Sequence, residues 1–228
     1  LDTGVGSIVN NNCGDSSSDC NGLSSPALAD LQGDGIIDRI YAGDLHGNLW
    51  AFNLSSTNPA SWASAYGSTP LAHACTSATC TAGNRQPITS RPALARHKTQ
   101  RSSTTAPNIM VFFGTGQYLA VNDSDSTLQQ TFYGVWDDGS GDVTRTDLLQ
   151  QTLSTDTSNG QTVRTLTDNS VDYGTQRGWY INLPTSKERV VTNAAAIGDL
   201  VFFNTMIPST SVCGYGGSGW LMLATQLN

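Results

Sequence analysis

Short apolar segments alternate with polar turns along most of the chain, and three groups of them follow one pattern. Each group begins with a run of small apolar residues, and the copies are SSPALA (24–29), SRPALA (90–95) and the fainter TNAAAI (192–197). An apolar strand follows each copy, and a strand rich in aromatic residues follows that one. The six predicted strands are RIYAGD (39–44), NLWAFNL (48–54), IMVFFGTG (109–116), QTFYGVWDD (130–138), LVFFNT (200–205) and GWLMLAT (219–225).

This order of strands occurs three times at irregular spacing, as expected for the blades of a β-propeller. A β-sandwich whose strands share the PALA sequence is the alternative. Since a blade takes roughly 40–50 residues, three recognisable units with insertions predict an incomplete ring. We therefore expect an all-β fold, a modified and partial β-propeller with loop insertions, in a single domain that covers 1–228.

Three segments lie outside the repeated pattern. Segment 1–22 contains a loop bounded by cysteines, and 55–84 reads as irregular surface. Segment 140–188 is predicted to be an insertion with strands of its own. Within it, Asn159 and Gly160 form a dipeptide typical of the turn of a β-hairpin.

Composition narrows the class of protein. Charged residues make up 13% of the chain and glycine occurs 23 times, which favours short strands joined by turns over helices. The net charge of −7 argues against a nucleic-acid partner, because phosphate binding needs clustered basic residues. No apolar run reaches the roughly 18 residues that span a membrane, so direct membrane insertion is not expected. The chain begins at Leu1 without a signal peptide, and we expect a piece of a longer protein.

The cysteines indicate an oxidising environment. Cys13 and Cys20 close one short polar loop, and Cys75 and Cys80 close another. Zinc sites usually use two Cys-x-x-Cys units, so we expect two local disulfides and an exported protein. Cys213 is left over, and either its partner lies outside this sequence or it is free.

Acidic residues gather at one connection of the repeated unit, DLQGDGIID at 30–38. Read as a calcium loop, this segment has oxygen ligands at alternate positions, and its sixth residue is a glycine that permits a sharp turn. The candidate ligands are Asp30, Gln32, Asp34, the carbonyl of Ile36, and Asp38. The loop lacks the glutamate at position twelve of an EF-hand, where Tyr41 stands. An ordinary acidic turn at Asp34-Gly35 is the alternative.

Several motifs, taken in order, resemble the C-terminal domain of the PilY family of type IV pilus biogenesis factors and tip-associated adhesins. They are NGLSSPALADLQGDGIIDRIYAGDLHGNLWAFNL, QPITSRPAL, VFFGTGQYL, QTFYGVWDD, RGWYINLP, ERVV and GGSGWLM, and they extend from Asn21 to about Leu223. The resemblance implies a modified β-propeller with a nine-residue calcium loop that maps onto 30–38. Gln32 stands where a shorter Asp or Asn is usual.

The resemblance also implies a function and a location. We expect a non-catalytic, calcium-binding module that supports pilus biogenesis, control of pilus extension and retraction, surface adhesion and twitching motility. Its expected partners are minor or major pilins, together with a host or abiotic surface. The expected location is the exterior of a bacterium: the cell surface or pilus tip, the outer membrane or the periplasm.

Two enzymatic classes are the alternatives. YAGDLHGNLWAFNL (41–54) is close to the Gly-rich strand repeat of calcium-dependent quinoprotein dehydrogenases, but an adjacent cysteine pair is missing. Ser218 in GYGGSGW suggests a hydrolase, but it lacks the G-x-S-x-G elbow and a following helix. His46, His73 and His97 are predicted in loops or turns without a paired motif, and no catalytic residue is assigned.

Overall fold

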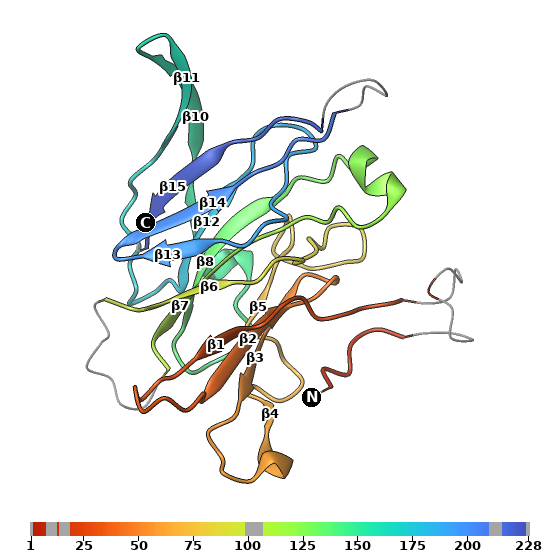
Figure 1. Ribbon diagram of the computed structural model, residues 1–228, viewed down its shortest axis with the longest axis vertical. Coiled ribbons are helices and arrows are strands. Elements are labelled where there is room, and N and C mark those ends of the chain that lie inside the picture. The colour runs from red at the N-terminus through yellow and green to blue at the C-terminus, as the bar shows by residue number, and fades with distance from the viewer. Residues whose placement is uncertain (1, 8–12, 14–18, 99–106, 210–215, 227–228) are drawn as a thin grey trace.

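Three sheets, each built on one copy of the repeated unit, follow one another along the chain (Figure 1). Their strands pair antiparallel, except for β9 (Leu149–Gln151) and β12 (Gly178–Asn182) in the second sheet, which pair with each other in parallel. The computed structural model describes residues 2–7, 13, 19–98, 107–209 and 216–226. Cys213 lies outside these residues. Among them, no helix is long and apolar enough to cross a membrane.

The first sheet has the order β1-β2-β3, and two short strands at its outer edge both pair with β3. Its strands are β1 (Ala27–Ala29), β2 (Arg39–Gly43), β3 (Asn48–Asn53), β4 (Ala63–Ser64) and β5 (Ala72–His73). The expectation that 55–84 is irregular surface is therefore wrong in part. Pairing with β3 satisfies the backbone of β4 and β5, and Leu71, Ala74 and Cys75 are buried next to them.

The second sheet has the order β6-β7-β8-β12-β9. Strand β12 pairs with β8 although it lies far along the chain from it, because the intervening segment carries the edge strand β9 and the β10–β11 hairpin. The strands are β6 (Ala93–Arg96), β7 (Ile109–Gly114), β8 (Thr131–Asp137), β9 (Leu149–Gln151), β10 (Leu153–Ser158), β11 (Gln161–Leu166) and β12 (Gly178–Asn182). Segment 140–188 thus contains an added hairpin and two strands of the second sheet, β9 and β12.

The hairpin turn is the predicted one. Ser158 pairs with Gln161 across Asn159 and Gly160, which have φ values of 51° and 76°. Positive φ at both central residues matches the right-handed twist of the flanking strands, and this is why Asn-Gly is favoured here. The hairpin projects from the rest of the molecule (Figure 1).

The third sheet consists of β13 (Ala195–Ile197), β14 (Leu200–Asn204) and β15 (Leu221–Thr225). Within the described residues, three short 3₁₀ helices lie in connections: η1 (Pro59–Ser61), η2 (Val121–Asp125) and η3 (Arg145–Asp147). The sheets do not close into a ring within the described residues, as predicted for a partial propeller with at least three recognisable blades.

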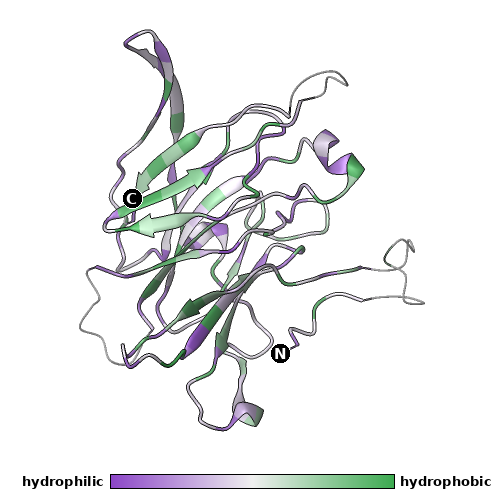
Figure 2. Ribbon diagram, in the orientation of Figure 1, coloured by the Kyte–Doolittle hydropathy of each residue, from purple (hydrophilic) through white to green (hydrophobic). Residues whose placement is uncertain are grey.

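The core is divided between the two faces of the second sheet. In β7, Ile109, Val111 and Phe113 pack in a cluster shared with the first sheet, whereas Met110 and Phe112 pack in a cluster shared with the third. Because side chains alternate across a strand and both faces are covered, every residue of β7 is buried. Figure 2 shows hydrophobic residues concentrated along the strands of all three sheets.

Candidate functional site

The acidic loop connects β1 to β2 at one end of the first sheet. Its two ends are held by sheet pairing, since Ala29 is the partner of Arg39 and the Asp38 amide donates to the Ala29 carbonyl at 3.0 Å. Between them the chain turns at Gly33 and Gly35, whose φ values are 78° and 86°. Residues with a Cβ rarely adopt this left-handed conformation, so glycine at these two positions permits the compact turn.

Asp30 organises the first half of the loop. Its Oδ1 accepts from the amides of Gln32 (3.1 Å), Gly33 (2.5 Å) and Asp34 (3.3 Å), and its Oδ2 accepts from the Gly35 amide at 2.7 Å. The Gly35 bond, followed by the bonds from the other loop amides, lowers the pKa of this carboxyl below its ordinary value. Asp30 is therefore charged at neutral pH.

The remaining candidate ligands differ in exposure. Asp38 is buried, and its carboxylate accepts from the Leu31 amide at 2.8 Å and from the Gln32 side chain at 3.3 Å. Asp34 is exposed and accepts from the Ile36 amide at 2.9 Å, and Ile36 is itself exposed. Asp38 therefore ties the end of the loop to its beginning.

The donors of the loop suit a hard cation in kind, since they are carboxylate, amide and carbonyl oxygens within nine residues. Their arrangement in the structure is not that of a closed coordination shell. In the part of the chain that is described, no three His, Cys, Asp or Glu side chains converge as metal ligands. The three aspartates instead accept hydrogen bonds from within the loop.

The second sheet holds the loop from the other side, through residues that the sequence analysis did not single out. Leu31 packs against the core between the first two sheets, and Nη2 of Arg96 in β6 donates to the Leu31 carbonyl. Directly after the loop, Arg39 places its Nε 3.0 Å from Oδ2 of Asp137, the last residue of β8. Of these contacts, the sequence offered a hint only of the one at Arg39, because this residue directly follows the candidate ligand Asp38.

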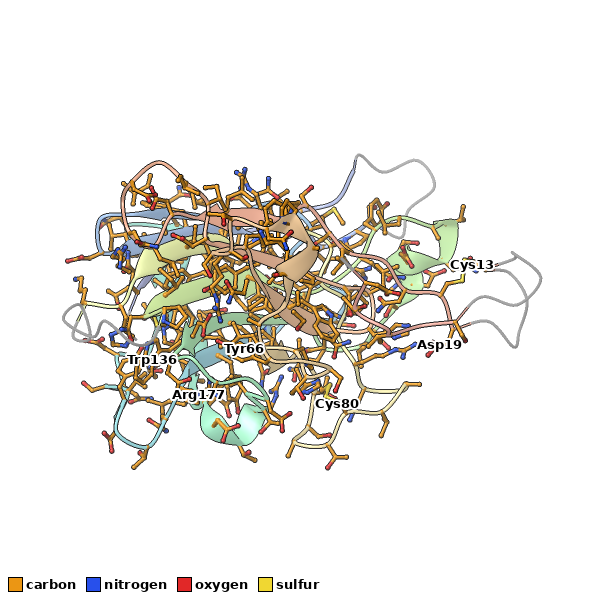
Figure 3. The ribbon with its side chains drawn as sticks, turned by 90° about the horizontal axis from the view of Figure 1, so that it is seen from below. Cys13, Asp19, Tyr66, Cys80, Trp136 and Arg177 are labelled. Atoms are coloured by element: carbon orange, nitrogen blue, oxygen red, sulfur yellow. A yellow bond between two sulfur atoms is a disulfide. The ribbon has the colours of Figure 1, made fainter. Side chains whose placement is uncertain are left out.

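Asp137 is fully buried and has four partners. Besides Arg39, the Tyr41 hydroxyl donates at 2.7 Å, the Gly139 amide donates at 3.1 Å, and the Tyr66 hydroxyl also donates. Burial, together with the Asp137 charge, raises the pKa of both tyrosines above the ordinary value. Both hydroxyls therefore remain donors at neutral pH. Figure 3 shows Tyr66 among the packed side chains near the middle of the molecule.

The three histidines lie in separate environments. His46 is in the β2–β3 turn, with Nε2 3.2 Å from Oδ1 of Asp19. His73 contacts Asn48 and Asp142 through its two ring nitrogens, each at 3.1 Å. His97 is buried beside the rings of Trp136 and Tyr173. The structure does not bring these histidines together.

The remaining candidates are also placed by the structure. Ser218 is exposed, and its backbone exchanges hydrogen bonds with Ile207 before β15 begins. The predicted disulfides are present, Cys13–Cys20 and Cys75–Cys80. Each joins residues of one local loop, and Figure 3 shows Cys13 near one end of the molecule.

Comparisons with known proteins agree with these motifs. Residues 1–166 match the family model described as the PilY1 beta-propeller domain. The type IV pilus biogenesis factor PilY1 of Pseudomonas aeruginosa is 36% identical over 241 residues, covering 88% of this chain and 20% of that protein. A PilY1 homologue of Xylella fastidiosa is also 36% identical, over 88% of this chain and 14% of that protein.

A solved structure supports the same assignment. The crystal structure of the Pseudomonas aeruginosa PilY1 C-terminal domain matches with a TM-score of 0.75 and 32% identity. The match covers 94% of this chain and 49% of that one, so this chain spans about half of the solved domain and a fifth or less of the two relatives above. Because the family model, the relatives and the solved structure agree, the chain belongs to the PilY1 β-propeller family.

Proposed function

We propose that this chain is a non-catalytic, calcium-binding propeller module of a type IV pilus-associated protein. In this role it supports pilus biogenesis, control of extension and retraction, surface adhesion and twitching motility. The observation that carries the proposal is the nine-residue acidic loop between β1 and β2 in a chain of the PilY1 family. The role named for the relatives, biogenesis factor, favours this function over a quinoprotein dehydrogenase.

The loop supplies the ligands for the cation. The cation would be held by Asp30, Gln32, Asp34, the carbonyl of Ile36, and Asp38. Four backbone amides of the loop already donate to the Asp30 carboxylate, and these hydrogen bonds hold the loop in a tight turn. Calcium tolerates irregular shells of six to eight oxygens, whereas magnesium requires a stricter octahedron, so this irregular set of oxygen donors favours calcium. Bound calcium would neutralise the carboxylates and fix the connection that leads into β2.

The proposed setting follows from the relatives and from the cysteines. Two disulfides are typical of an exported protein, and the pilus role named for the relatives favours the surface of a bacterium, its pilus tip, its outer membrane or its periplasm. The proposed partners are minor or major pilins, with a host or abiotic surface as the target of adhesion.

Calorimetric titration with calcium tests the proposal, using the purified chain and two single variants. Asp34→Asn removes an exposed carboxylate from the loop, and Asp156→Asn removes another exposed carboxylate from the β10–β11 hairpin. We expect one calcium ion per chain, an affinity about tenfold lower or weaker still in Asp34→Asn, and unchanged affinity in Asp156→Asn, because calcium affinity follows the number of charged ligands.

Magnesium at the same concentration should compete weakly. The proposal fails if the wild-type chain binds no calcium, or if both variants lose affinity equally, since an equal loss would reflect the overall negative charge of the chain rather than a site.

A further inference from the structure

The acidic loop is attached to two sheets, not to one. On its own sheet, it is held by the pairing of Ala29 with Arg39. The second sheet binds it near its start, through Arg96 and the Leu31 carbonyl, and just after its end, through Asp137 and Arg39. The candidate ligands from Gln32 to Asp38 lie between these two attachments along the chain, and Asp30 directly precedes the first.

The attachment at Arg39 has little freedom. The side chains of Arg39 and Asp137 are 9% and 0% exposed, and the Asp137 carboxylate is also bonded to Tyr41, Tyr66 and Gly139. Because Arg39 directly follows Asp38 and both are held in sheet geometry, displacement of the Asp38 main chain also displaces the Arg39 guanidinium. A buried ion pair whose carboxylate has further hydrogen-bond donors resists such a displacement.

The attachment at Leu31 is different in character. Arg96 is exposed, and its guanidinium reaches across from β6 to a backbone carbonyl in the first half of the loop. Leu31 is also bonded within the loop, since its amide donates to the Asp38 carboxylate at 2.8 Å. Leu31 is therefore the residue through which Arg96 influences Asp38.

Charge also links the two sites. Asp137 neutralises Arg39, which lies one residue from the proposed ligand Asp38. Without this carboxylate, the buried Arg39 guanidinium would be left without a counter-charge, directly after the loop along the chain. The same ion pair thus positions the loop and removes an unfavourable charge.

We propose that cation binding by the loop and the contact between the first two sheets are coupled, with Arg96 and the Arg39–Asp137 pair as positioning residues. This inference rests on the calcium binding proposed above. An occupied loop strengthens the contact between the sheets, and an intact contact raises the affinity of the loop. Such coupling is reciprocal for binding free energies, and measured couplings between sites commonly amount to 5–150-fold in affinity, so a change of about 5–10-fold is expected.

Calcium titration of positioning variants tests the coupling. Arg96→Met removes the bond to Leu31 but keeps an unbranched side chain of similar reach, and Arg91→Met is the matched control, because Arg91 is an exposed arginine in the segment that leads into β6. We expect about 5–10-fold weaker calcium binding in Arg96→Met and a change of less than about twofold in Arg91→Met. Asp137→Asn should weaken binding further.

Hydrogen exchange provides a second readout that does not depend on affinity. Calcium should slow exchange in the peptide that covers β8 and Gly139 in the wild-type chain, and should do so less in Arg96→Met at saturating calcium. Arg96→Met keeps the buried pair intact, so it tests the coupling even if Asp137→Asn does not fold.

The outcomes separate this inference from the proposed function. Absence of calcium binding in the wild-type chain removes both. Wild-type binding with equal affinity in Arg96→Met, and with no effect of calcium on exchange in β8, overturns the coupling and leaves the calcium site in place.

Discussion

Val190 packs directly against Gly114, at the point where the chain leaves the second sheet for the third. A Cβ added to Gly114 would lie 2.3 Å from the Val190 Cβ, and the Val190 amide donates to the Thr115 carbonyl at 2.9 Å. Ile88 has the same relationship to Gly43 in the first sheet: an added Cβ would lie 2.1 Å from its Cγ2. Its amide donates to Asp44 at 2.9 Å. In both sheets, a β-branched residue from the connection that follows packs against a strand glycine and donates its amide to the residue after that glycine.

Gly114→Ala should destabilise the chain by about 1–3 kcal/mol, because the added methyl group overlaps a buried valine in a packed core. Gly22→Ala is the control, since Gly22 has no neighbour within 4 Å of an added Cβ and its φ is not positive. Urea unfolding measures both free energies. Adding Val190→Ala to Gly114→Ala should recover part of the loss, and a double variant that is less stable than the sum of the two single changes would contradict this explanation.

Asp137→Asn should lower the free energy of unfolding by about 3–5 kcal/mol, because it leaves the buried Arg39 guanidinium without its counter-charge. Asp125→Asn is the comparison: Asp125 lies 3.3 Å from Lys187, with 77% of its side chain exposed, and a surface pair contributes at most about 1 kcal/mol. Denaturant unfolding of both variants tests the contrast. Similar losses in the two would show that burial of the Arg39–Asp137 pair does not set its importance.

Stability should fall with pH between about 6.5 and 4 because of His97. Burial lowers the pKa of this histidine from 6.5 to about 4, so the folded state keeps it neutral while the unfolded chain takes up a proton over this range. Stability is therefore present above the unfolded pKa and is lost as the pH falls. By this linkage the contribution lost between pH 7.5 and 4.5 is roughly 2–3 kcal/mol.

His97→Phe keeps a ring beside Trp136 and Tyr173 and removes the titrating group. Urea unfolding at pH 7.5 and 4.5 measures the loss of stability on acidification in the variant and in the wild type. The contributions of all other titrating groups are common to both proteins, so the difference between the two losses reports on His97. A loss of stability on acidification that is the same in the variant and the wild type would rule out His97 as the source.

The outward face of the third sheet should promote self-association of this chain. Leu221 is 74% exposed and Leu223 is 51% exposed, and the register places them on one face with Ile197, Leu200 and Phe202. Exposed apolar patches of this kind mark interaction surfaces. Leu221→Thr with Leu223→Thr should weaken association by about tenfold or more, as measured by sedimentation velocity, while keeping residues that favour strands.

Leu119→Thr with Val121→Thr is the matched control, because these residues are 71% and 93% exposed but lie in the connection between β7 and β8. If this pair reduces association as strongly, or if the unaltered chain remains monomeric at all concentrations, the face of the third sheet is not responsible.

Much of the fold follows from local pattern. The strands expected at 39–44, 109–116 and 200–205 became β2, β7 and β14, because runs of β-branched and aromatic residues between turn residues define a strand without reference to distant segments. The turn at Asn159 and Gly160 was equally readable, since it depends on the φ preference of two residues.

Other elements depended on pairing with distant residues. β4 and β5 are two residues each, which is too short for any periodic signal, and they exist because β3 offers them an edge. β12 was readable as a strand, but its sequence did not show that it pairs with β8 rather than with its neighbours in the insertion.

By itself, the sequence determined the repeated unit, the all-β class, the acidic loop and the two cystine loops, since each depends on residues close together in the chain. Only the tertiary structure decided which blade faces which, that Arg39 meets Asp137, and that Arg96 holds the loop. These contacts join residues tens of positions apart. Their partners are chosen by the packing of whole sheets, which no local pattern encodes.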